Sequence, residues 1–537
     1  MFIHMKDNIK LQTALAVIER LEAENKKYKE KINILEQEND QLREQVRLLL
    51  RLKFEKKTEK KLKLPQDAQQ YSLFDEAEAF RDEPVAESEP VQLELFRSAS
   101  STPKKRGRKT IAADIPRVDV VIDIPEEEKL CACGAHLVKI GEQVSEKLDI
   151  VPAKIQVVRT IRYKYACRRC EGVEDDRPTV RIAPMPPQLI KHGIVTPSLL
   201  TFLLVNKFAD ALPLYRQSNM LRRFGVDIAR STMSAWVLEA ARACTPLLER
   251  LYFHLRNGPA VNMDETPVQV LNEQGRENTA KSYMWVARGG QPGRTVVIFS
   301  YAPTRSGREV PLLLGNFTGF LQTDGYKGYE AMGRHEGITH VGCLAHVRRK
   351  FVEAAKAGKK NSAGTAAKIV ELIAHIYHTE HLLKGKFEKG RLCSEQFLEL
   401  RTKKIGPLFD AVETLMKEHE PRVLPSSLLG KALSYGLKHW KLVRNYLDCP
   451  YLTPDNNAAE NALRPFVVGR KNWLFSGSPR GAAASALFYS LIESARVNGL
   501  NLQDYLWQTL EKLPYAKTEE DFEALMPWAT FFDRNPA

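Results

Sequence analysis

Between residues 11 and 49, apolar positions recur with a seven-residue period. The a positions are Leu11, Ile18, Asn25, Ile32, Asn39 and Val46, and the d positions are Ala14, Leu21, Tyr28, Leu35, Leu42 and Leu49. β-Branched residues at a with Leu at d favour two parallel strands, and a buried Asn at a fixes their register. The pattern predicts a coiled coil that joins two chains in a homodimer. The alternative is a single helix, solvated or packed on its own chain.

The composition changes after this repeat. Residues 51–63 are strongly basic, Pro65 ends the helix, and residues 66–102 combine scattered acids, Ser and Pro with little periodicity, as a linker does. A basic stretch then follows at 103–109. An Arg-Gly-Arg core among lysines suits the negative potential of an A·T-rich minor groove, and a solubilising run of charge is the alternative. The candidate DNA contacts of this stretch are Lys104, Lys105, Arg106, Arg108 and Lys109.

Residues 196–242 have the pattern of three helices. Four leucines between 199 and 204 form an apolar face, Pro213 can begin a second helix that runs to Phe224, and Ser231–Thr232 can cap a third. A helix, a turn at Gly225 and a further helix match a helix-turn-helix, whose last helix enters the major groove. Ordinary helical bundles share this pattern. The candidate phosphate contacts are Arg222, Arg223 and Arg230.

Strand-like runs fill much of residues 258–345. The first ends on Asp264, the runs 283–287 and 295–301 flank a Gly- and Pro-containing hairpin loop, and a fourth leads to Asp324. A helix follows residues 340–343. This order predicts a mixed sheet of ribonuclease-H-like α/β topology, in which the first and fourth strands are neighbours.

Mostly helical sequence separates this sheet from a last acidic helix that begins near residues 455–457. We therefore expect a multidomain α/β chain. Its expected parts are a coiled coil at 1–64, a linker with the basic stretch at 65–115, a four-cysteine zinc domain at 116–185, helix-turn-helix-like helices at 186–255, a catalytic core at 256–351 and 455–490, a helical insertion at 352–454 and a C-terminal helical region at 491–537.

Charge and length narrow the class of protein. The chain has 537 residues, 43% of them hydrophobic, with a net charge of +14 and a pI of about 9.2. The length predicts several domains, and the excess of positive charge suits a polyanionic partner, although a membrane-surface or ribosome-associated protein has a similar balance. The N-terminus carries no apolar signal-like run, and the longest apolar run, 199–205, is too short to span a membrane. We expect a cytoplasmic, nucleoid-associated protein with no membrane partner.

Four of the eight cysteines are spaced as metal ligands. Cys131 and Cys133 form one pair, Cys167 and Cys170 a second, and the residues from 147 to 165 alternate apolar and polar as a hairpin would. Two such pairs brought together make a tetrahedral four-thiolate site, and in a reducing compartment metal binding is favoured over disulfides. We expect one structural Zn²⁺ without a catalytic role; isolated buried thiols are the alternative.

Three carboxylates lie where packed elements meet polar turns. They are Asp264, Asp324 and Glu460. Two Asp at strand ends and a Glu on a later helix can hold two divalent metals roughly 3.5–4 Å apart, which stabilise the attacking and leaving oxygens of a phosphodiester displacement. A bare Asp, Asp and Glu triplet is common, and the alternative makes Asp264 a turn residue and Glu460 a surface residue.

Further side chains are candidates for supporting roles. His346 is either a core histidine or a group that orients substrate near Asp324, and Arg464 lies one helical turn after Glu460. The basic and aromatic run 469–475 adds Lys471. Arg348 and Arg349, on the helix after residue 343, are candidate DNA contacts.

Several of these motifs together resemble insertion-sequence transposases of the IS66 family, over nearly the whole chain. The resemblance rests on the N-terminal heptads and on Cys131-x-Cys133-Gly134 with Cys167-x-x-Cys170, Met263-Asp264-Glu265-Thr266, Thr323-Asp324-Gly325-Tyr326, Gly342-Cys343-Leu344-Ala345-His346, Asn456-Asn457-Ala458-Ala459-Glu460-Asn461 and Ser490-Leu491-Ile492-Glu493-Ser494-Ala495.

The resemblance implies a DDE transposase in which Asp264, Asp324 and Glu460 bind two Mg²⁺ or Mn²⁺ ions. Its partners would be DNA, both element ends and target, and small accessory proteins of the same element. Many related enzymes carry a basic residue seven positions after the Glu; that position is Val467 here. Arg464, Arg470 or Lys471 would have to take its role.

Three other functions are compatible with parts of the pattern. A nuclease or recombinase with the same acids would cut DNA without strand transfer. A DNA-binding regulator descended from a transposase would use the N-terminal parts without chemistry, although all three acids are present. A structural coiled-coil adaptor would need neither the sheet nor the cysteine pairs.

Overall fold

The computed structural model describes residues 155–166, 180–191, 193–357 and 364–529, with a series of helical residues between 24 and 46. The chain divides into two compact units. One contains residues 1–81 and 183–537, and the other contains residues 82–182. Each unit is considered by itself. In the part of the chain that is described, no helix is both long and apolar enough to cross a membrane.

The described residues between 24 and 46 are helical, in agreement with the heptad pattern. The side chains expected at its seam are exposed in the single chain: Ile32 and Leu35 at 53%, Leu42 at 61% and Val46 at 52%. A second helix would cover an apolar stripe of this kind. The coiled-coil homodimer stays a prediction, because only one chain is present.

The smaller unit contains a two-stranded antiparallel ladder. Strand β1 (Lys164–Ala166) pairs with β2 (Val180–Ile182), with Lys164 opposite Ile182. The hairpin expected within 147–165 is therefore corrected at its C-terminal end, because β1 pairs with a strand that follows the second cysteine pair. Cys131, Cys133, Cys167 and Cys170 lie outside the described residues, as does the basic stretch 103–109.

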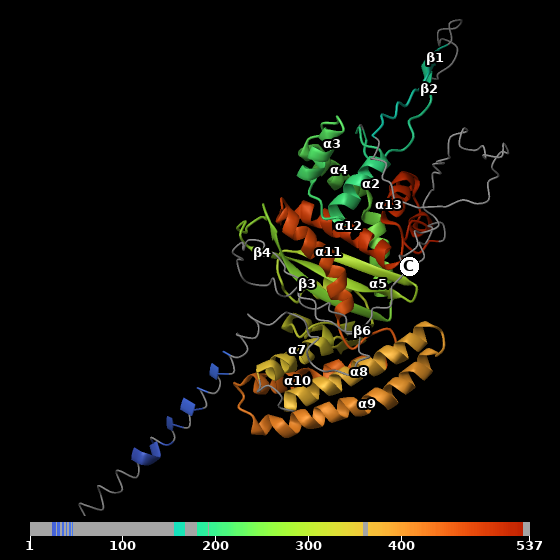
Figure 1. Cartoon of the computed structure of the whole chain (residues 1–537). Coiled ribbons are helices and arrows are strands. Elements are labelled where there is room, and N and C mark those ends of the chain that lie inside the picture. The colour runs from blue at the N-terminus through green and yellow to red at the C-terminus, as the bar shows by residue number, and fades with distance from the viewer. Residues whose placement is uncertain are drawn as a thin grey trace, which may run out of the picture. The chain divides into compact units, whose positions relative to one another are not determined.

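The larger unit is built on a six-stranded mixed sheet, drawn in the middle of Figure 1. Its strands are β3 (Ala260–Val270), β4 (Lys281–Gln291), β5 (Arg294–Ala302), β6 (Gly319–Gln322), β7 (Ile338–Val341) and β8 (Phe475–Ser476). The order is β5-β4-β3-β6-β7, and β8 pairs with the far end of β3. β3 is antiparallel to β4 and parallel to β6, so the first and fourth strands are neighbours as predicted.

Two strand boundaries differ from the sequence prediction. β3 continues through Asp264 to Val270, because residues 264–269 pair with the long strand β4. The loop expected at 288–293 shortens to Pro292–Gly293, since residues 288–291 pair with β5. Gly293 has a φ of +77°, which a glycine adopts without steric strain at this tight turn.

Helices pack on the sheet and on one another in this unit. Their bounds are α2 (Pro197–Phe208), α3 (Leu214–Arg223), α4 (Arg230–Ala243), α5 (Thr245–Arg256), α6 (Glu309–Leu314), α11 (Asn457–Trp473), α12 (Pro479–Val497), α13 (Leu502–Lys512) and α14 (Glu519–Glu523), with short 3-10 turns η3 (Lys327–Tyr329), η4 (Met332–Arg334) and η7 (Leu513–Tyr515). The three helices expected within 196–242 are α2, α3 and α4. The cap of α4 is corrected: Ala229 precedes the helix, and Ser231 and Thr232 lie in its first turn.

Helix α12 covers the outer edge of the sheet. β5 is an edge strand, and its Val297 and Phe299 amides donate hydrogen bonds to the hydroxyls of Ser494 (3.0 Å) and Ser490 (2.8 Å). Buried backbone amides need such partners. The Ser-x-x-x-Ser spacing within the motif at 490–495 thus has a structural role. Two serines about one helical turn apart accept from two amides that are two residues apart on the strand.

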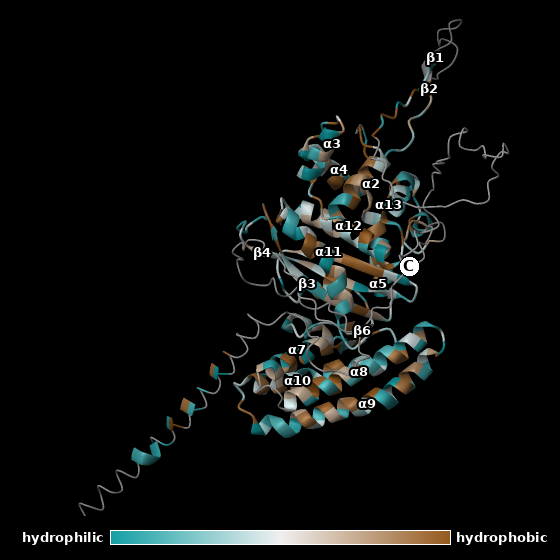
Figure 2. Ribbon diagram, viewed as in Figure 1, coloured by the Kyte–Doolittle hydropathy of each residue, from teal (hydrophilic) through white to brown (hydrophobic). Residues whose placement is uncertain are grey.

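The span 352–454 is helical, as expected, and has a core of its own. Helices α7 (Leu344–Ala357), α8 (Thr365–Glu388), α9 (Ser394–His419) and α10 (Leu428–Arg444), with the 3-10 turns η5 (Glu420–Arg422) and η6 (Asn445–Asp448), bury a second hydrophobic cluster. Figure 1 draws them together beyond β6, and Figure 2 shows apolar and polar residues mixed along each of them, as amphipathic helices require.

A buried ion pair ties these helices to the chain that returns toward the sheet. Arg401 of α9 forms a bidentate pair with Glu380 of α8, with nitrogen–oxygen distances of 2.6 and 3.1 Å. Arg401 also donates to the carbonyls of residues 446, 449 and 452 at 2.7–3.0 Å. Its side chain is fully buried. The three donors that are not engaged by Glu380 in this way therefore hold the segment that leads into α11.

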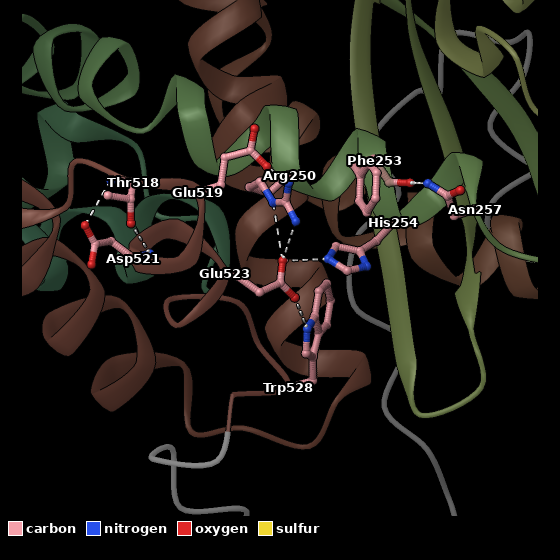
Figure 3. Close-up of polar contacts among 9 residues, drawn as sticks. All are labelled: Arg250, Phe253, His254, Asn257, Thr518, Glu519, Asp521, Glu523 and Trp528. Carbon is pink, nitrogen blue, oxygen red and sulfur yellow. Dashed lines mark hydrogen bonds and ion pairs between the residues drawn. The ribbon is translucent and has the colours of Figure 1, made fainter.

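The C-terminal segment is anchored on α5 through one carboxylate (Figure 3). Glu523 accepts from Arg250 (3.0 Å) and Trp528 (3.0 Å) and lies 2.8 Å from the His254 ring. The His254 and Trp528 rings meet edge to face with centroids 4.5 Å apart. These contacts, foremost among them the hydrogen bond with His254, hold the pKa of Glu523 below its ordinary value against the opposing effect of burial. The anchor is thus strongest when this carboxylate is ionised.

Candidate active site

Asp264 and Asp324 both lie just beyond the point where the pairing of β3 with β6 ends. Asp264 lies in β3, and Asp324 follows β6 by two residues. The last aligned pair of these parallel strands is Asn262 with Gln322, and each aspartate lies two residues beyond its member of that pair. Residues two apart on a strand share a face, so the two carboxylates are brought side by side.

Glu460 reaches the same region from α11. It lies in the first turn of that helix, which begins at Asn457, within the range predicted for the helix start. Its negative charge acts on Asp264 together with that of Asp324. The structure therefore brings together the three acids that sequence analysis singled out, from segments separated by up to 196 residues (264 to 460).

Buried amides fix the approach of α11 to the two strands. Asn456, which is 1% exposed, donates to the Met263 carbonyl (2.8 Å) and accepts from Asn262 (3.1 Å). Asn262 also donates to Gln322 (2.7 Å), whose own amide donates to the Thr453 carbonyl (2.9 Å). One polar network thus joins β3, β6 and the residue that precedes α11. Sequence analysis named Asn456 only as part of a motif.

The electrostatics of the site are those of crowded carboxylates. Burial, followed by the charges of Glu265, Asp324 and Glu460, raises the pKa of Asp264 well above its ordinary value. Backbone amides orient both aspartates: Glu265 N donates to Asp264 (2.8 Å), and Tyr326 N donates to Asp324 (2.9 Å). Like charges so close together are strained unless a cation or a proton joins them.

Sequence analysis missed a fourth carboxylate, Glu265. It points to the opposite face of β3 from Asp264 and is buried, at 2% exposure. Arg305 pairs with it at 2.5 Å, and the Tyr329 hydroxyl donates to it. Arg305 also lies over the Tyr326 ring, 3.9 Å from its centroid. Burial nevertheless outweighs these two partners and raises the pKa of Glu265, and only the tertiary structure brings the partners to it.

Asp455 is a second acid whose environment matters. It is 8% exposed, and burial followed by the charge of Glu460 raises its pKa to about 6, although the Asn457 amide donates to it at 3.2 Å. Tyr377 of α8 hydrogen-bonds to it as well. The helical insertion therefore contacts the segment that carries Glu460.

The predicted supporting residues are spread around this centre. His346 is partly exposed in α7 and interacts electrostatically with His439 of α10. Arg464 is partly exposed one turn after Glu460, and Lys471 is exposed near the end of α11. Arg470 instead ties α11 to β3, by donating to Thr266 Oγ1 (3.0 Å) and to the Pro267 carbonyl.

The predicted DNA contacts differ in exposure. Arg222, Arg223 and Arg230 are exposed at the end of α3 and the start of α4, and Arg222 pairs with Asp227 at 3.2 Å. Arg349 is partly exposed. Arg348 is only 7% exposed, so the expectation that it contacts DNA directly is corrected; its charge acts on the buried Tyr377 hydroxyl instead.

The donor set suits a hard divalent cation. Asp264, Asp324 and Glu460 offer carboxylate oxygens, the ligands that Mg²⁺ and Mn²⁺ prefer, and their mutual repulsion is what a cation relieves. Within the described residues no three acidic, His or Cys side chains are close enough to enclose a metal ion. The acids are therefore gathered in one place without forming a coordination shell.

Comparison with protein families covers most of the chain. Residues 192–484 match the family described as Transposase IS66, and residues 490–528 match the IS66 C-terminal element. Residues 128–171 match the zinc-finger binding domain of transposase IS66, a range that contains all four cysteines of the predicted zinc site. Residues 41–120 match a family described as Transposase C of IS166 homeodomain.

Curated relatives agree with this assignment. The chain is 34% identical over 460 residues to the uncharacterized protein y4jD of Sinorhizobium fredii, which covers 82% of this chain and 86% of that protein. It is 33% identical over 452 residues to the uncharacterized protein y4qI of the same organism, with 82% and 80% covered. With the family match spanning the sheet, the helical insertion and the three acids, this chain belongs to the IS66 family of transposases.

Proposed function

We propose that this transposase is a DDE enzyme that cuts DNA at the ends of its insertion element and joins the freed 3′-hydroxyl to target DNA. The observation that carries the proposal is the convergence of Asp264, Asp324 and Glu460 at one edge of the sheet. Membership of the IS66 family supports the same activity.

The topology supports a ribonuclease-H-like core. A central strand β3 lies between antiparallel β4 and parallel β6, with one aspartate on β3 and the next directly after β6. The third acid arrives on a helix after the insertion of α8 to α10. This assignment rests on strand order and direction, which are properties of the whole sheet.

The three acids are the proposed ligands of two Mg²⁺ or Mn²⁺ ions. Bound there, the metals would stabilise charge on the attacking and leaving oxygens of an in-line phosphoryl transfer. The chain's own part is to orient the ligands. The Glu265 and Tyr326 amides hold the aspartates, and the Asn262–Gln322–Asn456 network holds the start of α11.

Cationic side chains near the acids would position the DNA backbone. Arg464 follows Glu460 by one turn, and its place on α11 suits a phosphate close to the metals. Because Val467 is 9% exposed and Arg470 is bound to β3, Arg464 and Lys471 are the better candidates for the basic residue that related enzymes carry.

The other parts of the chain would assemble the DNA complex. We propose that Cys131, Cys133, Cys167 and Cys170 bind one structural Zn²⁺, which the zinc-finger match at 128–171 supports. The exposed arginines 222, 223 and 230 would contact phosphates, and residues 104–109 a minor groove. Pairing of two chains through residues 11–49 would hold two element ends in one complex.

A cleavage and joining assay tests the proposal. The full chain is incubated with DNA carrying the element's ends, a target plasmid and Mg²⁺ or Mn²⁺, with and without the accessory proteins of the element. Asp264→Asn should lower cleavage by about a thousandfold, since the charge that it contributes is worth several kcal/mol in the transition state. End binding should be nearly unchanged. Asp210→Asn, at an exposed position after α2, is the matched control and should cut normally.

The possible results separate the rival functions. Normal cutting by Asp264→Asn would contradict the assignment of the acid. Cleaved ends that are never joined to target DNA would identify a nuclease, and binding without cleavage in the presence of the accessory proteins would identify a DNA-binding regulator. Asp324→Asn and Glu460→Gln test the other two ligands in the same way.

A further inference from the structure

A cavity opens directly beside Asp324, between the sheet and the helical insertion. It measures about 290 Å³, close to the lower end of ligand pockets, roughly 300–1,000 Å³. Asp324 and Gly325 line one side, and α10 supplies Tyr435, Lys438 and His439 on the other. A pocket of this size accommodates one small planar group and excludes a duplex.

Helix α10 is docked closely enough to make this wall rigid. The Gly342 amide donates to the Leu442 carbonyl (3.0 Å), and a Cβ at Gly342 would lie 3.1 Å from the Val443 nitrogen. Gly325 is equally close to the wall itself: a Cβ there would lie 2.6 Å from the Tyr435 hydroxyl and 3.4 Å from His439 Nε2. The helical insertion therefore places the Tyr435 and His439 rings against Gly325, the residue that follows Asp324.

The two half-buried rings form a tilted pair. The Tyr435 and His439 centroids are 4.4 Å apart, and the ring planes are inclined by 42°. Aromatic faces of this kind stack on nucleic-acid bases without regard to sequence.

Two positively charged side chains lie at the opening of the same cavity. Lys438 and Arg334 are exposed lining residues, and Lys438 is 3.8 Å from Glu330, with side chains 58% and 45% exposed. Such an exposed ion pair contributes little free energy, so Lys438 can leave Glu330 and bind a phosphate instead. A base against these rings and a phosphate at the rim of the cavity would together make up one nucleotide.

We propose that this pocket binds one unpaired nucleotide of the DNA strand, next to the phosphodiester that is cut at the three acids. The base stacks on Tyr435 and His439, and the phosphate is held by Lys438 and Arg334. This inference rests on the proposed function, because Asp324 relates the pocket to the scissile bond. It gives the helical insertion a direct role: it extracts a nucleotide from the duplex and so sets the position of the cut.

Binding of end-modified DNA by the full chain tests the pocket. Fluorescein-labelled duplexes with one unpaired terminal nucleotide or with a fully paired end are compared in Ca²⁺, by anisotropy. Wild type should prefer the unpaired end, and Tyr435→Ala should lose that preference, by about tenfold, through the lost stacking. Tyr435→Phe keeps the ring and should retain it. Lys438→Ala should weaken binding of the unpaired end, whereas Lys441→Ala, an exposed residue of the same helix, should not.

Photocrosslinking locates the nucleotide. A 5-iodouracil at the unpaired position should crosslink to the α10 peptide that carries Tyr435 and His439. A crosslink elsewhere, or an unchanged preference in Tyr435→Ala, overturns the pocket even if cleavage proceeds. Loss of cleavage in every condition, with the preference and the α10 crosslink intact, overturns the proposed function and leaves the nucleotide site in place.

Discussion

Two buried groups of charges in this molecule are organised in opposite ways. In the helical insertion, Glu380 meets Arg401 in a bidentate pair, and the remaining Arg401 donors reach backbone carbonyls. Near the end of the β3–β6 pairing, burial and then the charges of Glu265, Asp324 and Glu460 raise the pKa of Asp264. The first group is complete within the chain. The second gathers like charges around a buried carboxylate, an arrangement that is typical of functional sites rather than of structural ion pairs.

Glu493 on α12 lies between these extremes. It is 3% exposed and pairs with Arg496 at 2.8 Å, yet burial outweighs that partner and raises its pKa to about 7. The three sites differ in how their neighbours act against burial of the carboxylate, and each can be disturbed separately.

Breaking the complete pair should have the largest effect on stability. Arg401→Met leaves the Glu380 carboxylate buried without its partner and frees three carbonyls, so the free energy of unfolding should fall by about 3–5 kcal/mol. Chemical denaturation measures the loss. Lys404→Met, at an exposed position of α9, is the control and should change little. An Arg401→Met variant as stable as wild type would show that the contacts of Arg401 do not contribute to stability.

Removing the charge of Glu493 should change how stability depends on pH. The folded-state pKa of about 7 lies above the ordinary value of 4.5, so the folded protein binds this proton more tightly than the unfolded chain. The contribution is present below about pH 4.5 and is lost as pH rises to 7, by roughly 2–4 kcal/mol. Glu493→Gln should flatten this part of a melting-temperature profile, and Glu511→Gln, exposed on α13, should leave it unchanged.

Removing the charge of Asp264 should stabilise the protein. In EDTA, Asp264→Asn relieves repulsion among the acids, and we expect the free energy of unfolding to rise by about 1–2 kcal/mol. Active-site residues often reduce stability in this way because they are kept for activity. Added Mg²⁺ should raise the melting temperature of wild type and not that of the variant, because only wild type keeps the full ligand set. A variant less stable than wild type in EDTA would mean that Asp264 has a compensating partner.

Local sequence pattern predicted the elements well. The helices α2, α3 and α4, the β4–β5 hairpin and the helical span after residue 352 all depend on periodicity and turn residues, which act over a few positions. The errors were at boundaries. β3 is longer than its own sequence indicates because β4 continues the ladder, and Ser231 does not cap α4 because the helix begins one residue earlier.

The sequence by itself determined the acids, the cysteine pairs and the order of strands and helices, because motif spacing and apolar periodicity are properties of the chain. Only the tertiary structure decided which groups meet. Arg305 pairs with Glu265 across 40 residues, Arg348 is buried rather than exposed, and Tyr435 and His439 reach Asp324 from a helix more than 100 residues away. Such contacts depend on how the sheet and the insertion pack. Packing between segments that are far apart in the chain produces no periodic pattern in the sequence, so it cannot be predicted from periodicity.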